Sequence, residues 1–586
     1  MLERACDLLA RAVRFVVVGL AVVMLASLTL QVVMRYVFGQ AQSWTEELAV
    51  TCFSWSMLLA IAAGVREGIH VRMDLLVEQL PTPLQIVLDK LVTLAIAGTG
   101  GFIAWSGVNY VRDAGGITSA AIGYSLTGSM PVRRSAAPSS PCSRSSASCS
   151  GRARRRRSPP EVSMSVTAWI LTAGFGTLVV LGMPFAFAIA ACVIAVVLAM
   201  GIEPMLLPQT LVAGTQSFSL LAIPFFMLAG ELMSAGGLSQ RLVRVADVFV
   251  RHLPGGMELA VILAALVFAA VSGSAPATTA AIGAVMIPAM AERGYSKAYA
   301  TALVVSAGVL APLIPPSIAF VIWGVIAEQS ITRLFLSGVL PGLLMALGMA
   351  AIAVTNGLRS RRPRAARATR PEIRAALREG IWALLAPVVV LGGIYGGAFT
   401  PTEAAVVACV YALFVGLVIE RRLHWRQLPA VLSSAMTISA IVMAIVAVSN
   451  GFSFPVAQEQ LATKLAAWLA LHFHEKWTML LALNIGFFLL AAVMDEIAIM
   501  VILGPMLISI ANQFGVDPIH FGATIVTNVA IGMAAPPIGY CLFVGMAISG
   551  LKLWPVARAI LPFVAMMLVV LVLVTYVPAF ALALVK

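Results

Sequence analysis

The hydrophobic pattern of the chain consists of long apolar runs separated by short polar or basic segments. Examples of such runs are Val16–Leu30, Val261–Val271 and Val564–Leu584. The first membrane helices are expected near Val13–Phe38, Leu48–Val65 and Leu84–Tyr110. Runs of this length satisfy their backbone hydrogen bonds in hydrocarbon as helices, so the pattern predicts an all-α polytopic membrane protein. Composition agrees, because 61% of the residues are hydrophobic and only 11% are charged.

Part of the pattern occurs twice. The stretch Gly294–Pro341 recurs as Gly515–Pro562, an offset of 221 residues (515 − 294). Upstream, Pro288 recurs as Pro505 at an offset of 217 (505 − 288). Proline and glycine recurring at a fixed offset indicate a duplicated unit, which chance matches between apolar residues would not produce. We therefore expect one repeat over about 164–358, a basic loop over 359–378, and a second repeat over about 379–586.

Each copy contains an apolar segment interrupted by two adjacent prolines, Pro315-Pro316 in the first and Pro536-Pro537 in the second. Proline removes a backbone donor and clashes with the preceding turn, so each helix is expected to open there. In a membrane, an opened backbone is tolerated only inside protein or against a watery cavity. A structural kink could explain one such pair, whereas interruptions matched between two halves are typical of a transporter's binding site.

The distribution of charge predicts the topology. The net charge is +13, and much of it lies in Arg133–Arg157 and Arg359–Arg378. Arginine-rich loops collect on the cytoplasmic side of membrane proteins, so this charge does not indicate nucleic-acid binding. The apolar pair Glu258–Ala270 and Ala277–Met290 has about a dozen residues per helix, too few for a core of roughly 30 Å, so a re-entrant hairpin is expected. The same count in the second half gives the opposite sense of crossing, which predicts an inverted-topology repeat.

The tip of the first hairpin is rich in small and hydroxyl residues. An unwound tip of this kind offers carbonyl and hydroxyl oxygens to a hard cation, although an ordinary close-packed turn uses the same residues. The candidate Na⁺ ligands here are Ser272, Gly273, Ser274 and Thr278, with Pro315 and Ser317 at the helix break. Candidate substrate contacts are Ser274, Thr278 and Pro316.

The second hairpin is expected over Leu480–Ala492 and Ile497–Ala511, with Asp495 at its tip. An acidic residue at membrane depth costs roughly 2.5–3.5 kcal/mol on insertion scales, which favours a functional role over an aspartate at the watery mouth of the hairpin. Asn528 and Gly532 of the adjoining broken helix are further candidate Na⁺ ligands. Two more candidate substrate contacts are Pro537 and Asn450, the latter in an apparent polar break of an apolar run.

Three N-terminal motifs resemble the small membrane subunit of tripartite ATP-independent periplasmic (TRAP) transporters. They are Met34-Arg35-Tyr36-Val37-Phe38, Trp44-Thr45-Glu46-Glu47-Leu48 and Arg66-Glu67-Gly68-Ile69-His70-Val71-Arg72-Met73-Asp74. Residues 164–586 resemble the large subunit, including Thr400-Pro401-Thr402-Glu403, which also suits a helix N-terminus. The resemblance implies a Na⁺ site between the first tip and its broken helix, an elevator-type motion, and a periplasmic solute-binding protein. The family pattern has a threonine before the second proline pair, where this chain has Ala535.

The segment 129–163 does not fit this pattern. It is rich in Ser, Pro and Arg, a composition that cannot span a bilayer or pack a core. Residues 1–128 carry three helices, whereas the small subunit of the family has four. Three helices from a cytoplasmic N-terminus would place Arg152–Arg157 outside, where basic runs are disfavoured. Our hypothesis is a frameshift or read-through junction between two adjacent genes, and a genuine disordered linker is the alternative.

The sequence predicts a multi-pass transporter of the bacterial inner membrane that takes up a small organic acid, a dicarboxylate or other carboxylate. We expect Na⁺ as coupling ion, no cofactor, no catalytic residues and no nucleic acid, since no Walker or His-Glu-x-x-His motif occurs. Its partners would be the lipid bilayer, the substrate and a periplasmic solute-binding protein. A divalent-anion/Na⁺ symporter without a binding protein is the alternative, which the N-terminal module disfavours. An intramembrane enzyme or a channel is more remote.

Overall fold

The computed structural model describes residues 2–40, 42–67, 81–113, 166–360, 364–473, 475–492, 494–537 and 539–585. Within these residues every regular element is a helix, and ten helices are long and apolar enough to cross a membrane. The expectation of an all-α polytopic membrane protein is therefore confirmed. The segment 129–163, on which the junction hypothesis rests, lies outside the described residues.

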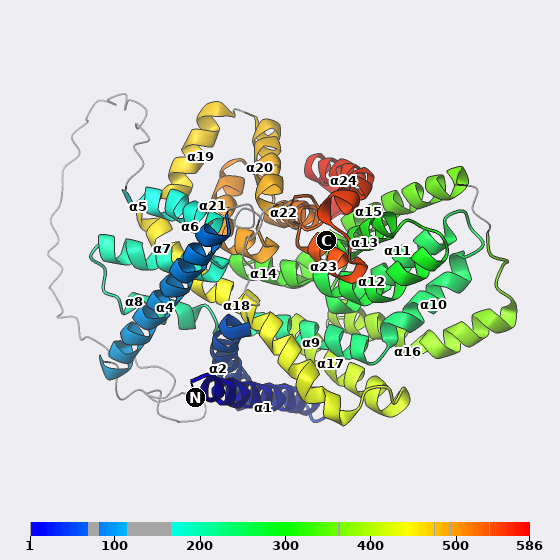
Figure 1. The fold of residues 1–586 in the computed structure, drawn as a ribbon, viewed down its shortest axis with the longest axis horizontal. Coiled ribbons are helices and arrows are strands. Elements are labelled where there is room, and N and C mark those ends of the chain that lie inside the picture. The colour runs from blue at the N-terminus through cyan, green and yellow to red at the C-terminus, as the bar shows by residue number, and fades with distance from the viewer. Residues whose placement is uncertain are drawn as a thin grey trace.

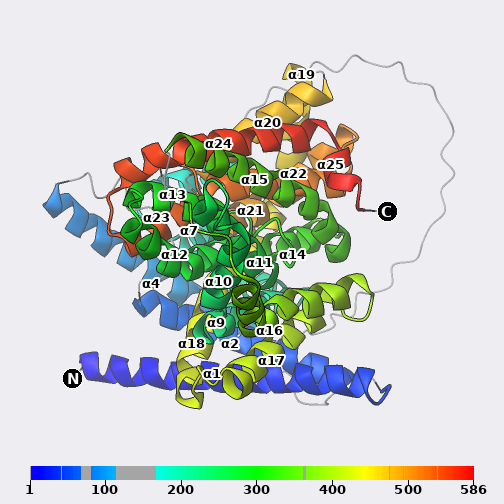
Figure 2. The same cartoon turned by 90° about the vertical axis from the view of Figure 1, so that its right-hand side faces the viewer.

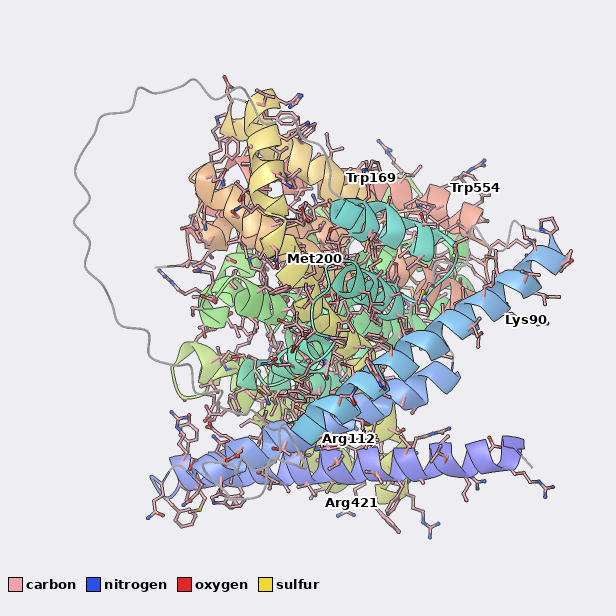
Figure 3. All side chains as sticks on the ribbon, turned by 90° about the vertical axis from the view of Figure 1, so that its left-hand side faces the viewer. Lys90, Arg112, Trp169, Met200, Arg421 and Trp554 are labelled. Atoms are coloured by element: carbon pink, nitrogen blue, oxygen red, sulfur yellow. The ribbon has the colours of Figure 1, made fainter. Side chains whose placement is uncertain are left out.

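The N-terminal module has the three expected membrane helices: α1 (Leu2–Tyr36), α2 (Ser43–Glu67) and α4 (Thr82–Asp113). Figure 2 shows α1 along one edge of the molecule, beside α17 and α18 of the larger part of the chain. Figure 3 shows α4 crossing the outer face, with Lys90 and Arg112 at well-separated points along it. Among the described residues α4 packs mainly on α7 and α8, and most of its surface is left uncovered.

The first half of the larger part contains thirteen short and long helices within the described residues. They are α5 (Val166–Trp169), η2 (Ile170–Gly174), α6 (Phe175–Val180), α7 (Phe185–Ala199), α8 (Leu206–Ala213), η3 (Phe218–Leu221), α9 (Ala222–Ala235), α10 (Leu238–Val250), α11 (Gly256–Ser272), α12 (Ala275–Glu292), α13 (Lys297–Gly308), α14 (Ile318–Ile326) and α15 (Ile331–Arg359). The second half begins at α16, after residues 364–369. It contains α16 (Arg370–Tyr395), α17 (Pro401–Phe414), η4 (Val415–Ile419), η5 (Trp425–Gln427), α18 (Leu428–Gln458), α19 (Leu461–His472), α20 (Lys476–Ala491), α21 (Glu496–Gln513), α22 (Pro518–Gly532), α23 (Tyr540–Ser549), α24 (Leu553–Tyr576) and α25 (Ala579–Leu582).

The helix order α11–α15 recurs as α20–α24. Each of the later helices begins 220 to 222 residues after its counterpart, as the starts at 256 and 476 and at 331 and 553 show. Both proline pairs fall in gaps of this series, one between α13 and α14 and the other between α22 and α23, so the predicted helix breaks are confirmed. The two series also pack reciprocally, because α12 contacts α23 while its counterpart α21 contacts α14.

The hairpin helices are longer than the sequence suggested. The two helices α11 and α12 have 17 and 18 residues, or about 26 Å of rise each, close to the thickness of a bilayer core. The helices extend into the tip because Val271 and Ser272 continue α11 and Pro276 is accommodated in the first turn of α12. Neither helix is among the ten candidate membrane spans of the described residues, so the re-entrant arrangement remains a prediction.

A polar contact joins the N-terminal module to the larger part. The Arg35 guanidinium lies 3.0 Å from Glu403 Oε1, and the Tyr36 hydroxyl donates to Glu403 Oε2 at 3.2 Å. Glu403 and Thr400 also form a capping box at the start of α17, which confirms the predicted helix N-terminus. Arg35, which the sequence analysis named only as part of a motif resembling the small subunit, therefore orients the end of α1 against α17.

Replacing Glu403 with alanine should destabilise the protein by about 1–3 kcal/mol, because a buried carboxylate with several donors is lost. Arg35→Ala should cost less, since this side chain is 47% exposed and its charge is partly screened. Arg4→Ala, at the exposed start of the same helix, serves as control. Thermal denaturation of the detergent-solubilised protein tests this order, and equal losses for Arg4 and Glu403 variants would contradict it.

Candidate functional site

The tip of the first hairpin lies directly on the first helix break. Gly273 adopts a left-handed backbone with φ of +60°, and its carbonyl accepts a hydrogen bond from the Ile318 amide at 3.3 Å. A Cβ added at Gly273 would lie 2.5 Å from the Pro316 carbonyl oxygen. Only glycine allows this approach, so the chain at the tip and the unwound chain before α14 are held in contact. The predicted pairing of the first tip with the first break is confirmed as geometry.

Three hydroxyl groups at this tip and its break, those of Ser272, Thr278 and Ser317, already have partners. Ser272 and Thr278 share a hydrogen bond of 2.8 Å between their hydroxyl oxygens, and both side chains are buried. Ser317 donates to the Pro312 carbonyl at 2.5 Å and accepts from the Phe320 amide at 3.2 Å, which caps α14. These bonds hold several oxygens at the break, where a desolvated cation could replace or share them.

The second tip also lies on its break, through different contacts. Gly532, at the end of α22, packs against Ala491 at the end of α20 so closely that a Cβ would overlap the alanine side chain. Asp495 precedes α21 and caps it by accepting from the Ile497 amide at 3.0 Å. Glu496 follows and is only 6% exposed, and its Oε2 atom has no hydrogen-bond partner among the described residues. The more deeply buried carboxylate is thus Glu496, which the sequence did not single out beside Asp495.

Asn528 occupies a different position from the one expected. Its amide nitrogen donates to the backbone and side-chain oxygens of Asn484 at 2.9 and 2.8 Å, in the middle of α20. The Asn484 amide in turn donates to the Thr575 hydroxyl of α24 at 3.0 Å. Asn484 lies seven residues before the end of α20, about 10 Å along the helix. Asn528 therefore contacts the middle of the hairpin helix α20 rather than the hairpin tip.

Both hairpin tips meet at one central cavity of about 60 Å³. The first half contributes Ser274, Pro276 and Ile318, and the second half contributes Asp495, Glu496, Ile497, Met533 and Tyr540. Met227 of α9 and Ile438, Ile441, Val442 and Ile445 of α18 complete the wall. Small-molecule sites typically measure roughly 300–1,000 Å³, so this cavity has room for an ion but not for an organic acid. Figure 1 places α14, α18, α21 and α23 around this central region.

The remaining candidate residues lie outside the lining of the central cavity. Asn450 is in the middle of the continuous helix α18, where its amide donates to the Val446 carbonyl at 3.1 Å, so the predicted polar break was wrong. The Asn-Gly-Phe-Ser sequence stays helical because the asparagine bonds within its own helix and Gly451 packs against Val193 and Thr210. Pro315 and Pro316 are buried beneath the first tip, whereas Pro537 is exposed.

Both parts of the chain match families of known proteins. Residues 172–580 match the family described as tripartite ATP-independent periplasmic transporter, DctM component. Residues 24–138 match the DctQ component of the same transporters. The first match covers more than half of the chain and includes both hairpins and both helix breaks.

The chain belongs to the TRAP transporter family.

One similar protein matches nearly the whole chain, and another matches only its larger part. The isethionate TRAP transporter permease protein DctMQ of Oleidesulfovibrio alaskensis is 33% identical over 599 residues, covering 96% of this chain and 93% of that protein. The C4-dicarboxylate TRAP transporter large permease protein DctM of Pseudomonas aeruginosa is 40% identical over 370 residues, covering 63% of this chain and 87% of its own. A solved structure of Neisseria gonorrhoeae MtrF gives a TM-score of 0.41 at 12% identity, covering 61% of this chain and 79% of that one.

The chain is therefore the membrane component of a TRAP transporter, with the small and large subunits in one polypeptide. TRAP permeases are inner-membrane proteins, which agrees with the ten candidate membrane spans. They take up solutes with the help of a periplasmic substrate-binding protein. The central cavity lies within the DctM-matching part, and the N-terminal module matches the DctQ component.

Proposed function

We propose that this TRAP permease imports a small organic acid by coupling its movement to Na⁺ binding at the hairpin tips. The observation that carries the proposal is the central cavity, which is lined by residues of both tips and by the first residues of the helices that follow the two breaks, Ile318 of α14 and Tyr540 of α23. Unwound chain there offers carbonyl oxygens, and Asp495 and Glu496 supply negative charge at the same place. A carboxylate retained at membrane depth is costly, and binding a cation offsets that cost.

The substrate class follows from the same site and from the relatives. The proteins similar to this chain are named for isethionate and for C4-dicarboxylates, both small organic anions. Ser317 and Asp495 each cap a helix that begins at the cavity region, and helix N-termini attract anionic groups. A small carboxylate or sulfonate held between these helix ends, next to the bound cation, would have its charge neutralised.

Transport requires the cavity to enlarge, because about 60 Å³ does not accept an organic acid. We propose that α11–α14 and α20–α23 form an inverted pair of units, each with a re-entrant hairpin, that moves as an elevator. The scaffold would consist of the N-terminal module with α9, α17 and α18, whose helices pack on one another. The central cavity lies between these two groups, which supports a sliding boundary there.

Uptake into proteoliposomes tests the proposal. The purified permease would be supplied with radiolabelled succinate or isethionate and the matching periplasmic binding protein. Uptake should require both the binding protein and an inward Na⁺ gradient, and replacement of Na⁺ by choline should reduce it to the background of protein-free vesicles. Na⁺-dependent uptake without any binding protein would instead identify a binding-protein-independent symporter. Uptake that proceeds equally in choline would contradict Na⁺ coupling.

A further inference from the structure

A second and larger cavity lies at the opposite end of the first hairpin from its tip. It measures about 620 Å³, which is within the usual range of small-molecule sites. Four segments line it: the connection between α10 and α11, the turn between α12 and α13, the end of α15, and the chain just before α16. In Figure 1 these elements lie together on the right-hand side of the molecule. The transport proposal makes no use of this cavity.

The charged residues of the lining are three arginines and one aspartate: Arg251, Arg293, Arg364 and Asp247. Arg251 lies 2.5 Å from Glu372 Oε2 and donates to the Ala366 carbonyl at 3.0 Å, which fixes the chain before α16. Arg293 and Arg364 are exposed, and their guanidinium groups make no hydrogen bond or ion pair with the described residues. The cavity therefore has two guanidinium groups available for an anion, and a third that is shared with Glu372.

The wall of the cavity is preformed. Gly255 has φ of +71°, and a Cβ there would overlap the backbone of Ala353, while a Cβ on Gly357 would overlap Gly255. Gly255 precedes the 17-residue helix α11 without a side-chain cap. The Gly256 amide donates to the Leu253 carbonyl at 3.0 Å, which leaves Met257 as the other first-turn residue at the cavity wall. Glu258 of the same turn is buried and accepts from the Tyr295 hydroxyl at 2.6 Å, and its carboxylate does not line the cavity.

We propose that this cavity binds a phosphate group, carried by an anionic phospholipid of the cytoplasmic leaflet. Guanidinium groups form paired, charge-assisted hydrogen bonds with phosphate oxygens, and the open end of α11 adds favourable dipoles. The basic segments around the cavity are expected on the cytoplasmic side, where pockets of this kind bind anionic headgroups. A soluble phosphate ester shares the same chemistry. A bound phosphate would link the turn after α12 to the segment before α16, and so join the hairpin to the connection between the two halves.

Native mass spectrometry of the full-length permease in detergent tests the proposal. The protein would be incubated with phosphatidylglycerol, with cardiolipin or with zwitterionic phosphatidylethanolamine, and a parallel thermal-shift series would use inorganic phosphate and glycerol phosphate. The variant is Arg293→Gln with Arg364→Gln. The matched control is Arg374→Gln with Arg378→Gln, which removes the same charge from exposed positions of α16 outside the cavity. A charge-retaining Arg293→Lys, Arg364→Lys protein shows whether loss of binding reflects charge rather than misfolding.

We expect anionic lipid to remain on the wild type and the control, and its affinity to fall roughly tenfold or more in the double glutamine variant, since charge-assisted bonds are lost. The lysine variant should recover part of that affinity. Protection by glycerol phosphate but not by phosphatidylglycerol would overturn the lipid assignment and identify a soluble phosphate ester. Equal retention of lipid by the variant and the control, or no preference of the wild type for any phosphate compound over phosphatidylethanolamine, would overturn the site.

Discussion

Gly273→Ala should reduce transport at least tenfold while leaving the protein inserted in the membrane. The backbone at Gly273 is left-handed, which costs an alanine about 1–2 kcal/mol. The new methyl group would also lie 2.5 Å from the Pro316 carbonyl oxygen, a backbone atom that cannot rotate away. The tip must then separate from the break, and the bond from the Ile318 amide to the Gly273 carbonyl is lost.

The matched control is Gly515→Ala, at the turn between α21 and α22. Gly515 also has a left-handed backbone, with φ of +63°, but nothing lies within 4 Å of an added Cβ. Forcing an alanine into the left-handed backbone destabilises both variants by a similar amount, and only Gly273→Ala also disturbs the contact between the hairpin tip and the helix break. Initial rates of substrate uptake in proteoliposomes, normalised to inserted protein, measure the effect. Equal rates for the two variants would show that the tip contact is unnecessary for transport.

Asp495→Asn should raise the Na⁺ concentration needed for half-maximal uptake at least tenfold. Asp495 lines the central cavity beside Glu496, so its replacement removes one of the two carboxylates that we propose to bind the cation. Asparagine keeps the side-chain oxygen that accepts from the Ile497 amide, so the cap of α21 is preserved. Glu496→Gln should have an effect of similar size, because this carboxylate is the more deeply buried of the two.

Asp517→Asn provides the control for this substitution. Asp517 caps α22 in the same way, accepting from the Ile519 and His520 amides at 2.9 and 3.0 Å, but it does not line the central cavity. The Na⁺ dependence of uptake would be measured for each variant at constant ionic strength, with choline as the replacement cation. If Asp495→Asn and Asp517→Asn give the same Na⁺ dependence as the wild type, Asp495 does not contribute to cation binding.

Several features could be predicted from the sequence because neighbouring residues encode them. The proline pairs open their helices wherever they occur, since the missing donor and the steric clash are local effects. The threonine and glutamate at positions 400 and 403 form their capping box within four residues of chain. The membrane helices of the N-terminal module follow from hydropathy alone, and the helix series α11–α15 and α20–α24 follows from the recurrence of proline and glycine.

Other features depend on contacts between distant segments, and only the tertiary structure decided them. Glu496 and Asp495 are adjacent in sequence, and packing alone buries one more deeply than the other. Asn528 bonds to Asn484 rather than to the hairpin tip because α22 packs along α20. The contact of Arg35 with Glu403 joins residues 368 positions apart. Hydropathy and turn signals act over a few residues, whereas the position of a side chain relative to a cavity depends on how whole helices pack. The sequence by itself therefore determined the helices and their breaks. The packing of the helices determined which residues meet at those breaks.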